Sequence, residues 1–218
     1  MTELWAGRGP LVDALVAAGI RDRRVLDAFG RLARECFVPP GSEAEAPLDE
    51  PIPISRGQVT TQPSLVARMV EGLRLTGGER VLEIGTGYGY QAAILAELAA
   101  EVWSIERFEE LARAARANLD GAGFHFVKVV VGDGTLGLVE HAPYQAIVVS
   151  AAAPAVPPPL VEQLDEGGRL VMPLGPGGND EVIAFRKEHG KLRRDQSLCH
   201  AYFVPLVGQH GLVERPIR

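Results

Sequence analysis

Cysteine and long apolar runs are scarce in this chain of 218 residues. Cys36 and Cys199 belong to no C-x-x-C or Cys/His cluster, so we expect small, buried, reduced thiols and no disulfide framework. No stretch reaches the ~18 uninterrupted apolar residues that a membrane helix needs. The start lacks the basic region of a signal peptide, and Asp13 interrupts the apolar stretch that follows. These absences predict a cytoplasmic protein that does not contact a membrane.

Basic residues are also too dispersed to form a stripe. The formal net charge is −6, whereas a protein that holds nucleic acid through its phosphates normally shows a basic face. The short cluster Lys191, Arg193 and Arg194 fits a solvated strand edge better. The five histidines show no metal-ligand spacing such as H-x-x-x-H. We therefore expect neither a nucleic-acid partner nor a bound metal.

What the chain does contain fits a single globular domain. Hydrophobic residues make up 46% and charged residues 23%, which is ordinary for such a domain. Single cores stop growing only near roughly 250–300 residues. We expect residues 1–218 to form one domain that works as a monomer, with an N-terminal part over 1–60 and the core over 61–218.

Apolar periodicity predicts N-terminal helices followed by alternating strands and helices. Amphipathic helices are expected at 10–19, 22–34 and 60–75, separated by a proline-rich irregular stretch at 38–58. Short apolar strands that alternate with helices indicate an α/β fold with a doubly wound, mostly parallel sheet. Strands are predicted at about 80–84, 101–106, 125–131, 144–149, 168–174, 180–187 and 197–205, and helices at about 90–99, 108–120 and 157–165.

A glycine-rich turn follows the first of these strands, in "VLEIGTGYGY" (81–90). Such a turn lets a ligand approach the backbone near a helix N-terminus, although tight turns also use glycine for steric reasons alone. The dinucleotide fingerprint is G-x-G-x-x-G, whereas Gly85, Gly87 and Gly89 are spaced by two and Tyr90 takes the position of the last fingerprint glycine. The spacing therefore argues against an NAD-dependent oxidoreductase.

Acidic residues near the strand ends indicate a different nucleoside ligand. Glu83 directly precedes the turn, and Glu106 ends the next strand, where an acid takes a pair of ribose hydroxyls. Asp133 and Gly134 follow the third strand, where a carboxylate can accept the exocyclic amine of adenine. A ligand with adenine and ribose but no pyrophosphate fits, which describes S-adenosylmethionine. A solvated strand end for Glu106 and a simple turn at Asp133 are the alternatives.

Five segments carry a family resemblance: "VLEIGTGYGYQAAILAELAAEVWSIER", "GDGTLGLVEHAPYQAIVVSAAAPAVPPPLVEQLDEGGRLVMPLG", "PIPISRGQVTTQP", "FVPP" and "FVPLVG". Over roughly residues 20–208 the chain resembles the protein-L-isoaspartate (D-aspartate) O-methyltransferases. The resemblance implies a seven-stranded, Rossmann-like methyltransferase fold with S-adenosylmethionine as cofactor and S-adenosylhomocysteine as product. It also implies methyl transfer to the free α-carboxylate of L-isoaspartyl residues in damaged proteins and peptides, which initiates their repair.

The resemblance assigns site residues as well. The family's loop usually reads G-Q-T-I-S-Q-P, so Thr61 stands at the position of a serine hydroxyl at the reacting centre. No base adjoins Thr61, and we expect it to orient the substrate carboxylate and not to act as a nucleophile. Segments 52–60 and 202–206 would cover an extended peptide. The expected substrate contacts are Ile54, Val59, Val204 and Leu206, and the expected cofactor contacts are Thr60, Thr61, Ser64, Glu83, Gly85, Gly87, Gly89, Glu106, Arg107, Asp133 and Gly134.

Two other functions stay open at this point. A small-molecule or nucleic-acid methyltransferase would use the same cofactor. Enzymes acting on nucleic-acid bases often carry Asn/Asp-Pro-Pro-aromatic after the fourth strand, and "SAAAPAVPPP" stands there instead. A catalytically silent binding module would use the loop 52–63 for structure alone. Turnover of labelled cofactor separates an enzyme from such a module.

Overall fold

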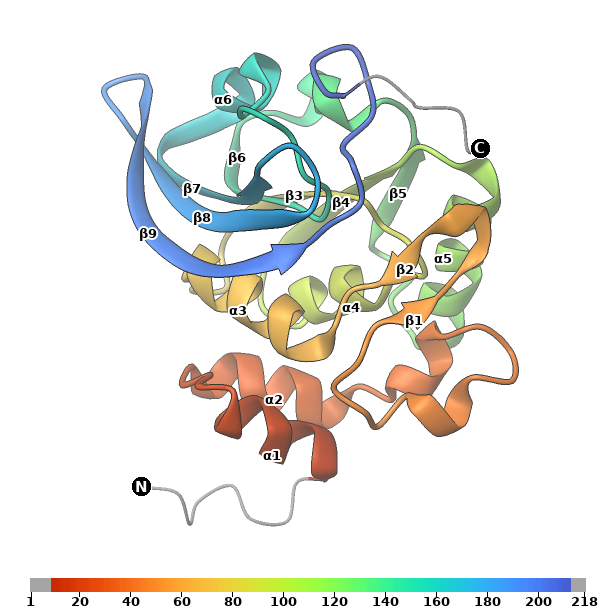
Figure 1. The fold of residues 1–218 in the computed structure, drawn as a ribbon. Coiled ribbons are helices and arrows are strands. Elements are labelled where there is room, and N and C mark those ends of the chain that lie inside the picture. The colour runs from red at the N-terminus through yellow and green to blue at the C-terminus, as the bar shows by residue number, and fades with distance from the viewer. Residues whose placement is uncertain (1–8, 213–218) are drawn as a thin grey trace.

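A seven-stranded sheet with helices on both faces organises the protein (Figure 1). The computed structural model describes residues 9–212, so the ends of the expected domain, 1–8 and 213–218, lie outside the described residues. The helices are α1 Pro10–Ala17, α2 Arg23–Arg31, α3 Pro63–Leu73, α4 Tyr90–Ala96, α5 Glu109–Gly121 and α6 Pro158–Gln163. The strands are β1 Ile52–Pro53, β2 Val59–Thr60, β3 Arg80–Ile84, β4 Glu101–Glu106, β5 Lys128–Val131, β6 Tyr144–Val149, β7 Leu164–Leu174, β8 Asn179–Glu188 and β9 Lys191–Tyr202.

The strand order confirms the predicted doubly wound, mostly parallel sheet. The order is β5-β4-β3-β6-β7-β8-β9, with β3 to β7 parallel and β8 antiparallel to both of its neighbours. The chain moves outward from β3 through β4 to β5 and then returns to β6 on the other side of β3. Ligands of open α/β sheets bind beside such a reversal, at the carboxyl ends of the strands.

Successive residues of the central strands point to opposite faces, and each face is covered. Val81 joins the apolar cluster that includes residues of α1, α2, α3 and α4, whereas Leu82 joins the cluster that includes Leu160 of α6. Both strand residues are fully buried. In Figure 1, α3 and α4 lie below the sheet and α6 above it. Burial on both faces explains why these strands read as continuous apolar runs in the sequence.

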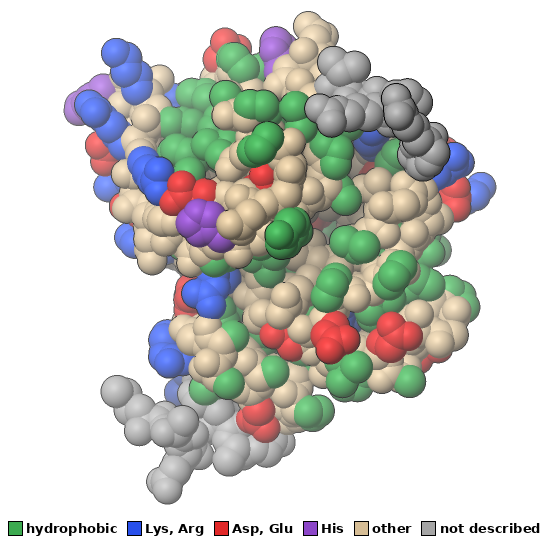
Figure 2. Space-filling view, viewed as in Figure 1, with side chains coloured by type: hydrophobic (Ala, Val, Ile, Leu, Met, Phe, Trp, Pro, Cys, Tyr) green, Lys and Arg blue, Asp and Glu red, His purple; other side chains and the backbone are tan. Residues whose placement is uncertain are grey.

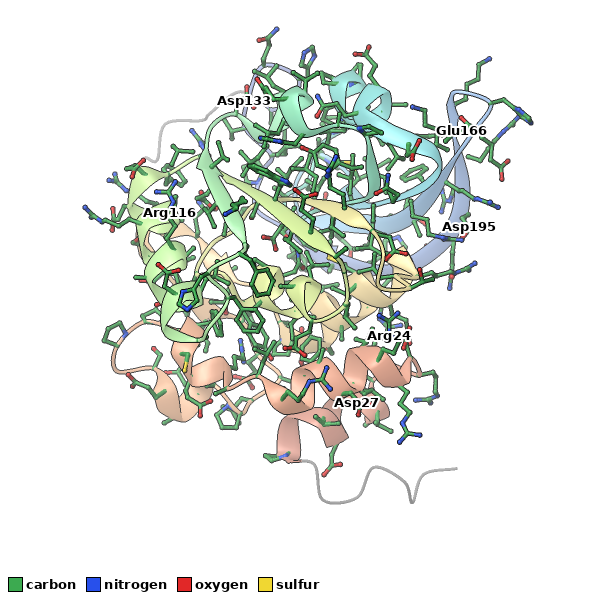
Figure 3. The ribbon with its side chains drawn as sticks, turned by 180° about the vertical axis from the view of Figure 1, so that it is seen from behind. Arg24, Asp27, Arg116, Asp133, Glu166 and Asp195 are labelled. Carbon is green, nitrogen blue, oxygen red and sulfur yellow. The ribbon has the colours of Figure 1, made fainter. Side chains whose placement is uncertain are left out.

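Arg24 is one of the side chains that tie the N-terminal helices to the core. Asp22 caps α2 by accepting a hydrogen bond from the Arg24 amide at 2.8 Å. The Arg24 guanidinium reaches out of α2 and donates to the carbonyls of Leu75 and Leu98, at 2.6 and 3.2 Å (Figure 3). These bonds give hydrogen-bond partners to two carbonyl groups that lie just after the ends of α3 and α4.

C-terminal predictions were wrong at several boundaries, among them the start of β7, which was predicted at about 168 and lies at Leu164. The helix predicted to reach residue 165 ends at Gln163, because Leu164 is already extended and pairs with Tyr144. A register shift after that pair lets β7 run directly out of α6. The last strand was predicted from 197 but begins at Lys191, since its first half is an exposed, charged edge without apolar alternation. Edge strands tolerate such charges well.

The proline-rich stretch before α3 is ordered around a small hairpin, which the sequence did not predict. Strands β1 and β2 pair antiparallel through Ile52 and Thr60, and Ile52 is fully buried. A short 3-10 helix, Arg34–Phe37, precedes this stretch and points Arg34 and Phe37 inward. Cys36 lies on the opposite side and is exposed, so the expectation that both thiols are buried was wrong.

Replacing Gly89 tests how closely α4 and α5 approach. Gly89 caps α4 with φ 94°, and a Cβ there would lie 3.2 Å from Leu119 Cγ. We expect Gly89→Ala to lower the free energy of unfolding by about 1–3 kcal/mol, measured by chemical denaturation. The control is Gly121→Ala in α5, where nothing lies within 4 Å of an added Cβ. Equal losses in both variants would contradict this account.

Candidate active site

A cavity opens at the carboxyl ends of β3 and β4, beside the reversal in strand order. The β1–β2 hairpin and the segment after β9, 204–207, supply its outer walls. Figure 2 shows the side of the molecule on which these two walls lie, with hydrophobic side chains gathered there. The expected site residues that line the cavity are Ile54, Val59, Thr60, Thr61, Gly85, Gly87, Glu106, Arg107, Gly134, Val204 and Leu206.

The glycine turn presents its backbone to this cavity. Gly85 and Gly87 both line it with positive φ, 94° and 56°, so neither position suits a side chain. Gly89 does not line the cavity, and its lack of a side chain serves the packing against Leu119 instead. The first two glycines thus allow a ligand to approach the backbone, whereas the third allows the helices to pack.

Glu106 lies at the end of β4 with both carboxylate oxygens held by the backbone. The amide of Gly87 donates to Oε2 at 2.9 Å, and the amide of Phe108 donates to Oε1 at 3.1 Å. Burial raises the pKa of Glu106, and these amide hydrogen bonds oppose that rise. Two carboxylate oxygens offer about four acceptor sites, so each retains a lone pair for a ligand. The arrangement suits a vicinal pair of hydroxyls.

The loop before α3 brings two neighbouring threonines to the cavity, and they differ in their partners. The Thr60 hydroxyl accepts hydrogen bonds from the Ile52 amide at 3.0 Å and from Arg34 at 3.2 Å. The Thr61 side chain lines the cavity and makes no hydrogen bond to any residue between 9 and 212. Of these two hydroxyls, the one on Thr61 is therefore available to a ligand.

Residues 8–211 match the family described as protein-L-isoaspartate(D-aspartate) O-methyltransferase. The chain belongs to this family. A protein-L-isoaspartate O-methyltransferase 2 of Pelobacter propionicus is 50% identical over 200 residues, which cover 91% of this chain and 89% of that protein. The enzyme of the same name from Marinobacter nauticus is 51% identical over 198 residues, 90% of each chain.

Solved structures agree with membership of the O-methyltransferase family. One protein-L-isoaspartate O-methyltransferase superposes with a TM-score of 0.84 at 29% identity, over 94% of this chain and 67% of the other. A second, from Plasmodium falciparum and in complex with S-adenosyl-L-homocysteine, gives 0.78 at 22% identity, over 90% and 96% of the two chains. The second likeness concerns the fold alone. Together they confirm the predicted Rossmann-like methyltransferase fold.

Glu83, expected to touch the cofactor, lies behind the cavity wall of this O-methyltransferase. Its side chain has no exposed surface and does not line the cavity. The Ser104 hydroxyl donates to Oε2 at 2.5 Å, while Oε1 has no partner among the described residues. Burial raises the pKa of Glu83 to about 8, against the hydrogen bond from Ser104 and with help from the nearby charge of Glu106. Glu83 is thus protonated at neutral pH.

This raised pKa has a consequence for stability. The folded protein holds a proton on Glu83 between its ordinary pKa of 4.5 and about 8, whereas the unfolded chain loses it near 4.5. The contribution of Glu83 to the free energy of unfolding is therefore fully present below its ordinary pKa of 4.5. It is lost progressively as the pH rises from there through about 8. We expect Glu83→Gln to remove this decline, which is worth roughly 5 kcal/mol in total.

The measurement is the free energy of unfolding from about pH 5 to pH 8.5. Exposed Glu45 supplies the control, and Glu45→Gln should keep the wild-type slope. A Glu83→Gln variant with an unchanged slope would show that Glu83 is ionised in the folded family member.

Asp133 and Ser64 also stand apart from the cavity, although both were expected to bind cofactor. The Asp133 carboxylate accepts hydrogen bonds from the Thr135 amide and hydroxyl, at 2.9 and 2.7 Å, and from the Gln209 amide at 2.7 Å (Figure 3). Burial alone would raise the pKa of Asp133, but these hydrogen bonds outweigh it and lower the pKa. Asp133 caps its turn and anchors the C-terminal segment, and its neighbour Gly134 lines the cavity.

Several cavity residues of this methyltransferase carried no signal in the sequence. Gln91 donates to the Ser150 hydroxyl at 3.0 Å, yet its Oε1 and the Tyr90 hydroxyl are buried without partners among the described residues. All three residues line the cavity. Unpaired buried polar atoms cost free energy, so a ligand that carries hydrogen-bond donors fits this wall. S-adenosylmethionine has such donors on its amino-acid and nucleoside parts.

Residues 9–212 contain neither a candidate metal site nor a candidate membrane span. That part of the chain contains no group of three or more His, Cys, Asp or Glu side chains that could hold a metal ion. It also contains no helix that is long and apolar enough to cross a membrane.

Proposed function

We propose that the cavity binds S-adenosylmethionine and that Thr61 orients the α-carboxylate of an isoaspartyl residue toward its methyl group. As a member of its family, the protein is an S-adenosylmethionine-dependent protein carboxyl O-methyltransferase, whose reaction initiates the repair of isoaspartyl sites. One observation carries the assignment of roles. Thr61 lines the same cavity as Glu106, and its hydroxyl makes no hydrogen bond within residues 9–212.

The residues present fit the cofactor. Gly85 and Gly87 leave the backbone open beside the place for its methionine part, and Glu106 offers acceptors to the ribose hydroxyls. Gly134 lines the cavity on the side proposed for adenine, and its lack of a side chain lets the backbone pack against Ile84, where a Cβ would lie 2.3 Å from a side-chain carbon. Arg107 lines the same cavity, with its guanidinium 4.6 Å from the Phe108 ring centroid. When bound, S-adenosylmethionine supplies a methyl group on a positively charged sulfur.

For this reaction the protein mainly has to position the substrate carboxylate and the methyl group. A carboxylate with a pKa near ~4 is ionised at neutral pH, so no general base has to activate it. Its oxygen forms the new bond to the methyl carbon while the carbon–sulfur bond breaks. Thr61 donates a hydrogen bond that aims this oxygen, and reacting atoms about 3 Å apart are the geometric requirement. Ile54, Val204 and Leu206 form an apolar wall that keeps water away.

An extended peptide fits the mouth of the cavity better than a compact side chain. Val59, at the rim, is 46% exposed although it belongs to the short strand β2. The hairpin β1–β2 is a two-stranded sheet with free edges, which can pair with a peptide backbone. Recognition through backbone would accept isoaspartyl sites in many sequence contexts.

We also propose that the enzyme acts as a monomer in the cytoplasm. Both cysteines are free, in keeping with a reducing compartment. Size-exclusion chromatography with light scattering should give the mass of one chain, 23.4 kDa, with and without cofactor.

The test of the function is labelling with methyl-labelled S-adenosylmethionine. Two peptides are compared that differ only in one aspartyl or isoaspartyl linkage. We expect base-labile label on the isoaspartyl peptide alone. Label on neither peptide, together with measurable cofactor binding, would reject this function and favour a small-molecule acceptor. The absence of cofactor binding would favour a silent binding module.

A further inference from the structure

A buried arginine lies behind the loop that carries Thr60 and Thr61 into the cavity. Its guanidinium donates hydrogen bonds both to this cavity loop and to the stretch before β1. Arg34 is 3% exposed, and Nη1 donates to the carbonyls of Ala46 at 3.1 Å and Leu48 at 2.7 Å. Nη2 donates to the Glu50 carbonyl at 2.9 Å and to the Thr60 hydroxyl at 3.2 Å. The planar, multiply donating guanidinium is suited to such a set, whereas the ammonium of lysine is one point charge. Arg34 thus fixes Thr60 to a separate part of the chain.

Asp49 holds the loop from the other end. Its Oδ1 accepts from the Ser64 amide at 2.7 Å, and its Oδ2 accepts from the Gln62 side-chain amide at 3.0 Å. Gln62 is the N-cap of α3 and caps it with no side-chain hydrogen bond of its own. Asp49 therefore acts as the cap of α3 from outside the helix, where a negative charge is favourable.

These two contacts enclose the residue proposed to aim the substrate. Thr60 is bonded to Arg34 and Gln62 to Asp49, and Thr61 lies between them with no hydrogen bond of its own to the described residues. A side chain that must stay free for substrate cannot fix itself in place. Its position depends on its chain neighbours, and a displacement of about 1 Å can cost on the order of 100-fold in rate.

We infer that Arg34 and Asp49 are positioning residues that hold Thr61 in its place for methyl transfer. The inference rests on the function proposed above. Neither residue lines the cavity, so neither contacts cofactor or substrate directly. A purely structural role would lower stability without a selective effect on turnover. A positioning role lowers kcat through Thr61 and leaves cofactor affinity unchanged.

The test is a double-mutant cycle between Arg34 and Thr61 in the full chain. Arg34→Lys should lower kcat on the isoaspartyl peptide by about ten-fold, with the Kd of S-adenosylmethionine changed by less than about two-fold. In a Thr61→Val background the same substitution should change kcat by less than about two-fold, because no hydroxyl remains to be positioned. Asp49→Asn, which loses one of its two acceptor oxygens, is the second variant and should behave in the same way.

A second measurement does not depend on turnover. Amide hydrogen exchange over residues 59–64 should become faster in Arg34→Lys and in Asp49→Asn, while exchange over β3, Arg80–Ile84, stays unchanged. The matched control is Arg31→Lys, since Arg31 is an exposed arginine nearby that donates to Glu97. It should leave kcat and the exchange of 59–64 at wild-type values.

The outcomes separate this inference from the proposed function. Equal losses of kcat from Arg34→Lys in both backgrounds, or unchanged exchange over 59–64, would overturn the positioning role. No labelling of isoaspartyl peptide by the wild-type protein would overturn the proposed function, and hydrogen exchange would still report whether Arg34 and Asp49 hold the loop.

Discussion

Thr61→Val is expected to lower kcat on an isoaspartyl peptide by about 100-fold. Valine has the shape of threonine without the hydroxyl, so the loop keeps its packing and loses one hydrogen-bond donor. The Thr61 hydroxyl has no structural partner within residues 9–212, and its removal should therefore leave the unfolding midpoint unchanged. Steady-state kinetics with saturating cofactor measures the effect.

Thr61→Ser is the control for this substitution. Serine keeps the donor and restores the residue that the family usually has at this position, so activity should stay within about three-fold of wild type. Wild-type turnover by Thr61→Val would show that the hydroxyl does not aim the carboxylate. A large loss in Thr61→Ser would instead point to the methyl group of threonine.

Glu106→Gln is expected to weaken binding of S-adenosylmethionine by about 100-fold, or ~2.7 kcal/mol. The carboxylate accepts from the amides of Gly87 and Phe108 and offers its remaining lone pairs to the ribose. A glutamine places an NH₂ group against one of these amide donors and removes the negative charge. Isothermal titration of the cofactor measures the loss directly, without reference to any peptide substrate.

Glu101→Gln is the matched control because Glu101 begins the same strand, β4, at the end away from the cavity. Its carboxylate pairs with Arg80 at 2.5 Å and accepts from Trp103 at 2.9 Å. Cofactor affinity should stay within about two-fold of wild type in this variant. If Glu106→Gln also kept wild-type affinity, the ribose would have to be held elsewhere.

The sheet could be read from the sequence where strands are short, apolar and bounded by turn residues. Strands β3, β4 and β6 have the predicted bounds, since burial on both faces makes most of their interior residues apolar. Prediction was weaker at the exposed edge of the sheet, where β9 begins at Lys191. The first half of β9 pairs with β8 through backbone hydrogen bonds, which place no demand on the side chains and so leave no pattern in the sequence. The hairpin β1–β2 has only two residues in each strand, too few for a periodic signal.

The site was partly readable for a similar reason. Gly85, Gly87 and Glu106 lie in a local motif, and they line the cavity. Arg34 and Asp49 support that cavity through contacts with segments 12 or more residues away, which no local pattern reveals. Glu83 and Asp133 belong to the same motif, but their carboxylates bond neighbouring protein groups, so their contact with the cofactor stays a prediction.

The wall formed by residues 204–207 affects the enzyme while it is being synthesised. The glycine turn and the hairpin are made long before this wall, which pairs with Ala152 only after β8 and β9 have been added. A nascent chain that stops before Val204 therefore has an open, unfinished site. We therefore expect methylation to begin only once that segment has been synthesised and has closed the cavity.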